Sequence, residues 1–330
     1  MSASLIVLIP VALLGLVAAL CFVGCILPTS GLAFTAYRST TVLGNPNLVA
    51  FWPLDDPNNS VQARELEAMP PIPGNYIVDT IAINAPPGLF PDPAVPNVSA
   101  AAPGDLLWFQ AGIVAGDVLG GNASLKSPCV TVNGGFVSVP FDPRINPPSF
   151  TVEAWVTVGW RATDPTAFRV VVDCRTFAGN NVNGFALFAN PGNQWVAAIG
   201  GGAAGQTTLT GASVVFGSAP VYLAMTYDNP SQTLKLFVNG VLSAPAMPNV
   251  PFVPNTATNL FIGSGEPSFP LRPQPTLPPA QTAPLTPFVG KMQDVAVYNA
   301  ALAGGTMDAN DVIFTHYTNG SGSGVDDDDT

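Results

Sequence analysis

The chain has 330 residues, of which 9% are charged and 48% hydrophobic, and its formal net charge at pH 7 is −11. Phosphate binding needs clustered Lys and Arg, so a chain with only 10 basic residues is not expected to bind nucleic acid. The 32 Gly and 35 Pro favour short strands joined by long turns and loops rather than helices.

The N-terminus is an almost unbroken apolar run. No charged side chain precedes Arg38, and residues 5–27 are long enough to cross a bilayer, which takes about 20 apolar residues in a helix. We predict that residues 1–27 form a retained single-pass anchor in the lipid bilayer. A cleaved signal peptide and a helix buried in the core of a filament stay open as alternatives.

The orientation of the anchor rests on signals that disagree. Arg38 lies on the C-terminal side of the run and mildly favours a domain inside the cell. The domain's composition, its two cysteines and its family resemblance favour the outside, which is our prediction. Small residues such as Gly15 and Ala19 allow helices to pack closely in lipid, so self-association through this segment is open.

The rest of the chain divides by composition. Residues 28–46, small and polar, are predicted to be a linker, and 47–319 hold the strand candidates. Residues 320–330, Gly-Ser repeats followed by an Asp run, are predicted to be a flexible acidic tail. Two proline-rich stretches, 60–104 and 267–287, are expected to be extended loops within the domain.

Short apolar or alternating segments at fairly regular spacing predict an antiparallel β-sandwich. Asn239-Gly240 between apolar residues predicts a hairpin at 236–242. The only helix expected beyond the anchor is one turn near 303–312. The predicted strands are 48–52, 135–139, 150–158, 169–172, 185–188, 195–199, 221–227, 234–238, 259–263 and 292–298.

Read in order, these segments resemble the laminin-G-like, concanavalin A-like jelly-roll family. The resemblance implies an all-β fold of two curved antiparallel sheets packed face to face, in which the first and last strands pair. It also implies recognition of carbohydrate or of protein partners, often with a calcium ion at the rim. The residues that carry it are 49–56, 134–140, 150–156, 222–228, 234–240, 262–264, 288–302 and 316–320.

The resemblance supplies the candidate metal ligands. Asp55 or Asp56 after the first strand and Asp294 in the closing strand are expected to approach one another. Ca²⁺ takes several oxygen ligands and combines carboxylates with carbonyl groups, so these three residues are the predicted calcium ligands. The alternative is that they are acidic turn residues facing water.

The tryptophans are the candidate sugar platforms, because an aromatic ring can stack on a sugar only where it is exposed. Trp52 and Trp155 lie within strand patterns and are expected in the core. Trp108, Trp160 and Trp195 lie near predicted loops and are the candidate ligand-binding residues.

Cys129 and Cys174 both adjoin strand-like sequence. Two cysteines in an exported domain suggest a disulfide, so a Cys129–Cys174 bridge is the prediction. Two separate buried thiols are the alternative, because sequence alone cannot place the two Cα atoms within bridging distance.

The sequence offers little for catalysis. His316 is the sole histidine and has no Ser or Cys pattern beside it for a triad. Glycosidases use two carboxylates about 5–9.5 Å apart, and Glu153 is the only acid in its strand. We therefore predict a non-enzymatic, membrane-anchored recognition module, displayed on the surface, that binds a glycan or a surface protein. A structural subunit of a filament or virion is the alternative, and a glycan hydrolase a minor third.

Overall fold

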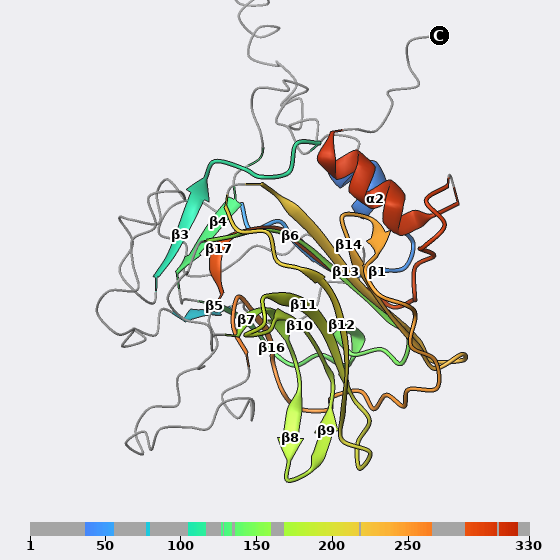
Figure 1. The fold of residues 1–330 in the computed structure, drawn as a ribbon. Helices are drawn as coiled ribbons and strands as arrows, with labels where there is room; N and C mark the ends of the chain where they lie inside the picture. The colour runs from blue at the N-terminus through green and yellow to red at the C-terminus, as the bar shows by residue number, and fades with distance from the viewer. Residues whose placement is uncertain are drawn as a thin grey trace, which may run out of the picture.

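The computed structural model is an all-β sandwich of two antiparallel sheets, which confirms the predicted fold class (Figure 1). No helix among the described residues is long and apolar enough to span a bilayer, and the predicted anchor, 1–27, lies outside them. The structure describes residues 37–55, 77–79, 105–116, 127, 129–133, 136–159, 168–217, 219–265, 288–308 and 310–322.

The larger sheet has eight strands in the order β15-β14-β13-β6-β17-β4-β3, with β1 also paired to β17. One half of β17 pairs with β4 and the other half with β1, so the predicted pairing of the first and last strands is confirmed. The strands are β1 Leu48–Trp52, β3 Asp105–Gln110, β4 Cys129–Asn133, β6 Phe150–Val158, β13 Val221–Asp228, β14 Thr233–Val238, β15 Val241–Leu242 and β17 Val289–Tyr298.

The second sheet has seven strands in the order β12-β11-β10-β7-β16-β5-β2. A separate hairpin, β8 with β9, projects from one end of the sandwich (Figure 1). The strands are β2 Ile77–Asp79, β5 Phe136–Val139, β7 Arg169–Asp173, β8 Thr176–Ala178, β9 Asn181–Asn183, β10 Phe185–Ala189, β11 Gln194–Gly200, β12 Gln206–Ser213 and β16 Leu260–Ile262.

Strand β6 shows how the larger sheet presents two different faces. Val152 and Ala154 point into the core between the sheets, because alternate side chains of a strand face opposite sides. Glu153 and Trp155 point to the outer side, where Trp155 joins a second apolar cluster. Both Trp155 and Trp52 are buried, as predicted.

Two short helices cover that outer side and bury the second cluster. They are the π-helix η1, Tyr37–Val42, and the C-terminal helix α2, Val312–Ser321, which contact each other. Figure 1 shows α2 in red with the blue η1 behind it. Asp311 caps α2 by accepting a hydrogen bond from the Phe314 amide at 2.8 Å, and Gly322 ends it in the left-handed conformation with φ 72°.

Both helices differ from the sequence prediction. Residues 37–42 belong to the predicted linker, yet Tyr37, Arg38 and Val42 are buried in the fold. The helical turn expected near 303–312 is wrong, because the described residues of 303–311 are not helical; helix α2 begins only at Val312 and includes the start of the predicted tail. Its sequence, VIFTHYTNGS, is rich in β-branched residues, which are modest helix formers, and contains a glycine, so its packing on the sheet outweighs its weak propensity.

The strand predictions hold best where apolar residues are continuous. Each predicted strand corresponds to an observed one, and the hairpin at Asn239-Gly240 is confirmed, with φ of 52° and 73° at its two turn residues. The strands that were not predicted are β2, β3, β8, β9 and β12. Strand β12 is a polar edge strand in which Leu209 is the one buried side chain, so it carries almost no apolar pattern.

Candidate binding site

An open pocket of about 370 Å³ lies between η1 and α2, on the outer side of the larger sheet. Its volume falls near the lower end of the range for small-molecule sites, about 300–1,000 Å³. Hydroxyl, amide and imidazole groups supply the side-chain polarity, and no carboxylate, Lys or Arg is among the described residues that line it. These residues are Thr40, Thr41, Gly44, Asn45, Pro46, Val312, Thr315, His316 and Asn319.

His316 of α2, which lines the pocket, is bonded to Glu153 at the centre of β6. His316 Nδ1 lies 2.8 Å from Glu153 Oε2. The hydroxyls of Tyr222 and Tyr298 each donate to one carboxylate oxygen at 2.6 Å. Strands β13 and β17 thus each supply one hydroxyl to the Glu153 carboxylate of β6, and that carboxylate bonds His316 of α2.

The pairing controls the ionisation of these buried groups. Burial alone would raise the pKa of Glu153, but the charge and hydrogen bond of His316, with the bonds from Tyr222 and Tyr298, lower that pKa below its ordinary value. Burial, followed by the nearby Glu153 charge, raises the pKa of Tyr222 and Tyr298 well above the ordinary value. Near neutral pH the cluster therefore holds one carboxylate and two neutral phenols.

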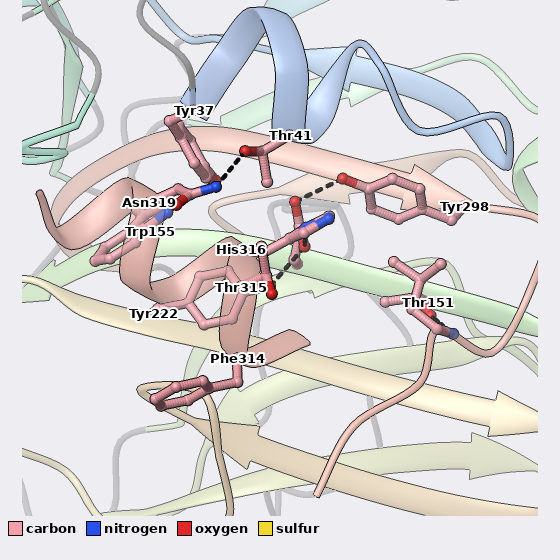
Figure 2. Close-up of polar contacts among 12 residues, drawn as sticks. Tyr37, Thr41, Thr151, Trp155, Tyr222, Tyr298, Phe314, Thr315, His316 and Asn319 are labelled. Carbon is pink, nitrogen blue, oxygen red and sulfur yellow. Dashed lines mark hydrogen bonds and ion pairs between the residues drawn. The ribbon is translucent and has the colours of Figure 1, made fainter. Parts of the chain in front are cut away.

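Aromatic packing fixes the same region. Trp155 Nε1 donates to the Tyr37 hydroxyl at 2.9 Å, and its ring stacks on Tyr317 of α2 at a centroid distance of 6.1 Å. On one wall of the pocket, Asn319 Nδ2 donates to Thr41 Oγ1 at 2.8 Å and so joins α2 to η1. Figure 2 shows Trp155, Tyr37, Asn319 and Thr41 close together between the two helices and the sheet.

The predicted calcium position contains a cation from the chain itself. Asp55 and Asp294 do come together, but the guanidinium of Arg38 bonds to both, at 2.8 Å in each case. Asp294 sits in a β-bulge of β17 with a φ of 53°. Asp56 lies outside the described residues, within which no group of three His, Cys, Asp or Glu could hold a metal. Arg38 takes the place expected for the ion, and calcium at these residues stays a prediction.

The three tryptophans predicted to stack on a sugar lie in different parts of the molecule. Trp195 is fully buried in the main core, so it cannot present its ring to a sugar, and its prediction as a ligand-binding residue is wrong. Its strand β11 lies next to the edge strand β12, and consecutive buried residues along it show that both of its faces are covered. Trp108 lies on strand β3, and Trp160 lies outside the described residues.

The predicted disulfide is absent, because Cys129 and Cys174 are both free and buried. They belong to different sheets: Cys129 begins β4, and Cys174 follows β7. Each thiol has its own partner, the Ala111 carbonyl oxygen at 3.1 Å and the Asn146 side-chain oxygen at 3.2 Å. The alternative of two separate buried thiols is the one that the structure shows.

Sequence reasoning missed the Glu153–His316 pair and the two tyrosines bonded to it. The residues are 163 positions apart, so no local motif joins them. The available signal was Glu153 itself, a lone acid in the middle of an apolar strand. Such a residue, when buried, needs hydrogen-bond donors, and the sole histidine was a candidate to supply one.

Comparisons with known proteins agree with the fold. A laminin G model, described as concanavalin A-like lectin/glucanases superfamily, matches residues 132–306, more than half of the chain. No curated protein matches the sequence.

Several solved structures are similar in fold at low sequence identity. The CBM40 of the Ruminococcus gnavus IT-sialidase, bound to alpha2,3 sialyllactose, is 16% identical with a TM-score of 0.37, over 51% of this chain and 88% of that one. Trypanosoma rangeli sialidase in complex with sialic acid is 12% identical with a TM-score of 0.47, over 83% of this chain but only 33% of the sialidase. The binding domain of botulinum neurotoxin DC in complex with SialylT is 12% identical with a TM-score of 0.37, over 56% and 39%.

Proposed function

Because the chain belongs to the concanavalin A-like lectin/glucanases superfamily, we propose that it is a non-catalytic recognition module that binds a glycan between η1 and α2. The observation that carries the proposal is the pocket itself, whose side-chain polarity comes from hydroxyl, amide and imidazole groups. Such groups can exchange hydrogen bonds with sugar hydroxyls, and Pro46 and Val312 add apolar surface for the faces of a sugar ring.

Catalysis fits this pocket poorly. Glycoside hydrolysis needs a carboxyl group in contact with the glycosidic bond, and usually a second one opposite it. The carboxylate beneath the pocket, Glu153, is fully buried and bonded through both oxygens to Tyr222, Tyr298 and His316. It can orient the imidazole but cannot reach a substrate.

We also propose that residues 5–27 anchor the module in a bilayer with the domain outside. Residues 28–36 are all that separate this run from η1, and nine extended residues span at most about 30 Å. The pocket, which η1 helps to form, is therefore held close to the anchored end of the chain. Deleting residues 1–27 should release the protein from membranes while its β-sheet circular dichroism is unchanged.

A structural role in a filament or virion remains the second candidate, because the same apolar run contains small residues such as Gly15 and Ala19. Detergent extraction followed by electron microscopy separates the two. Dispersed particles support an anchored module, whereas extended polymers that persist in detergent support the structural subunit.

Glycan binding is tested with the detergent-solubilised full chain on a glycan array. Thr315→Val replaces a pocket-lining hydroxyl by a methyl group of the same shape and should abolish the signal. Thr208→Val makes the same change on the exposed face of edge strand β12, away from the pocket, and should bind normally. Absence of binding to any glycan, with the protein folded, would refute the proposed function.

A further inference from the structure

We propose that the open edge of strand β12 is an interaction surface for a second copy of this chain. The second copy pairs its own β12 with this edge, so that the two seven-stranded sheets become continuous. The proposal goes beyond glycan binding and does not depend on it. It rests on the backbone groups at the edge, on the apolar side chains around it and on the lack of charged residues in that part of the sequence.

Alternate residues of β12 turn their backbone N–H and C=O groups away from the sheet. In an antiparallel pair, residues that exchange hydrogen bonds alternate with residues that do not. The Gly201 amide donates to the Gly205 carbonyl oxygen at 2.7 Å, so the odd-numbered residues of 205–209 bond to β11. Gly200, the next residue of β11, donates to the opposite side, to the Gly184 carbonyl oxygen at 2.8 Å, which agrees with this alternation. The residues of β12 that face the open edge are therefore Gln206, Thr208 and Thr210.

No described part of the chain closes this edge over 206–210. Strand β12 is the last strand of its sheet, and no described residue bonds to the outward amides of Thr208 and Thr210, whose side chains are exposed. Further along, the Ala212 amide donates to Ser243 Oγ at 2.6 Å, which joins the end of the strand to the chain after β15. The register shift between β11 and β12 also lies beyond Thr210, so 206–210 is a regular edge.

The sequence of β12 lacks the usual protection of an edge strand. Sheets protect an open edge with charged side chains, proline, bulges or very short strands. Strand β12 has eight residues, QTTLTGAS, with no charge and no proline among them. Its threonines favour a strand conformation. An edge of this kind is a template on which another strand can pair.

Apolar side chains surround the same edge. Of the four large apolar side chains that are exposed among the described residues, three adjoin it. Val215 follows the end of β12, and Val253 packs close to Gly202 in the turn before β12. Val241 lies in β15, two residues before Ser243. Burial of these side chains adds a favourable hydrophobic term to backbone hydrogen bonds that are individually worth little in water.

The distribution of charge favours a second copy as the partner. No charged residue occurs between Arg175 and Asp228 or between Lys235 and Glu266. These two stretches contain β12, β15 and all three exposed valines. The whole chain has a net charge of −11, so two copies repel each other, and they approach with least repulsion through the uncharged stretches. A basic partner would find no carboxylate in either stretch to pair with.

A two-fold axis makes the edge complementary to itself. Antiparallel pairing centred on Thr208 puts this residue opposite its own counterpart and Gln206 opposite Thr210, so each outward N–H meets an outward C=O. The side chains of Thr208 and Thr210 share the outer face of the sheet, because Leu209 between them points into the core. Cross-strand threonine pairs are favourable. The described residues that line the pocket lie in neither uncharged stretch, so this pairing does not use them.

The test measures self-association of the full chain in detergent by analytical ultracentrifugation over a range of concentrations. We expect a monomer–dimer equilibrium. Thr208→Lys puts like charges opposite each other and should raise the dimer Kd at least about tenfold. Thr306→Lys makes the same change on an exposed threonine in the loop before α2 and should dimerise like the wild type. Thr208→Val keeps the backbone bonds and should also dimerise.

Hydrogen exchange locates the contact without a variant. At concentrations above the dimer Kd, the outward amides of Thr208 and Thr210 should exchange slowly, and dilution to the monomer should make them exchange fast. The amides of Thr207 and Leu209, which bond within the sheet, should be protected at both concentrations. This alternation along the strand is specific to pairing at the edge.

Three results would overturn the inference. One is a chain that stays monomeric at the highest concentration measured, with the amides of Thr208 and Thr210 exchanging fast. Another is a dimer that Thr208→Lys leaves intact and that does not protect these amides, because it forms through another surface such as the apolar run 5–27. The third is protection of these amides in the monomer at every dilution, because another part of the chain then covers the edge. None of the three results bears on glycan binding at the pocket.

Discussion

Arg38 shows how one side chain can fix the beginning of the described chain. Its guanidinium is buried, bonds to Asp55 and Asp294, and lies 5.6 Å from the centre of the Phe51 ring. Two carboxylates that share one buried location repel each other unless a cation lies between them. The strand pairing of β1 with β17 brings the acids together, and Arg38 makes that approach stable.

Replacing Arg38 by Met should destabilise the domain by about 3–5 kcal/mol, because it leaves two buried carboxylates without their cation. Urea denaturation measures the change. The matched control is Arg144→Met, which breaks the pair with Asp142 at 2.9 Å but on a side chain that is 32% exposed, so the expected loss is at most about 1 kcal/mol. Equal losses for the two variants would contradict this account.

Calcium at Asp55 and Asp294 is tested by melting the wild-type protein in calcium and in a chelator. Binding only the folded state raises the melting temperature. A higher melting temperature in calcium that Asp294→Asn removes would support the calcium prediction. Identical melting curves in calcium and in chelator would contradict the calcium prediction and indicate that Arg38 alone neutralises these carboxylates.

Cys129 and Cys174 should be unreactive in the folded protein. Burial raises the pKa of Cys129 to about 12, and burial likewise raises the pKa of Cys174. The thiolate is the reacting species, so both should resist a thiol reagent at neutral pH and react only after denaturation. Peptide mapping without reductant should find Cys129 and Cys174 each as a free thiol, and a peptide that links the two would contradict the structure.

At the scale of elements, α2 depends on a glycine where it meets the sheet. A Cβ on Gly320 would overlap the ring of Trp155 and press on Tyr37. Gly320→Ala should therefore push α2 off the sheet and destabilise the domain by about 1–3 kcal/mol, even though alanine is the better helix former. The neighbouring Ser321→Ala adds no atom and serves as the control.

The readouts are the melting temperature and the tryptophan fluorescence, since Trp155 packs against both helices. An alanine at 320 that leaves both unchanged would show that α2 is not docked through this contact.

The elements differ in how far the sequence predicts them, for physical reasons. Strands β6 and β17 are mostly apolar, and Asn-Gly favours the tight turn at 239–240. Each of these elements can therefore be predicted from the local sequence. Helices η1 and α2 have weak local preference and form because they cover an aromatic face. The Glu153–His316 bond of the site and the Arg38–Asp294 bond join residues 163 and 256 positions apart, which no local pattern reveals.

At the scale of the molecule, the two ends of the described chain close the outer face of the larger sheet. Helix η1 precedes β1 and helix α2 follows β17, and the Asn319–Thr41 bond joins them across 278 positions. The buried Glu153 cluster lies under this junction. Changes in the ionisation of the cluster should therefore change the stability of the contact between η1 and α2. The dependence of the unfolding free energy on pH measures this effect.

The sign of that dependence differs between acid and base. The folded-state pKa of Glu153 lies below its unfolded value, so its stabilisation is full above about pH 4.3 and is lost as the pH falls toward the folded pKa. The pKa values of Tyr222 and Tyr298 are raised in the folded state, so their stabilisation is present below about pH 10 and is lost as the pH rises beyond it.

Tyr298→Phe separates the cluster from the background titration of the other acids. It removes one hydrogen-bond donor to Glu153, so the pKa of that carboxyl should rise toward its ordinary value. The variant should therefore lose less stability than the wild type as the pH falls from 5 to 3, an interval of about two units around the usual Glu pKa. Above pH ~10 the variant should also lose less, because one buried phenol is gone. Urea unfolding free energies across the pH range measure both arms. If the unfolding free energies of wild type and Tyr298→Phe fall in parallel below pH 5, the Tyr298 hydroxyl does not affect the pKa of Glu153. The packing of the two helices on the outer face would then not depend on the charge beneath them.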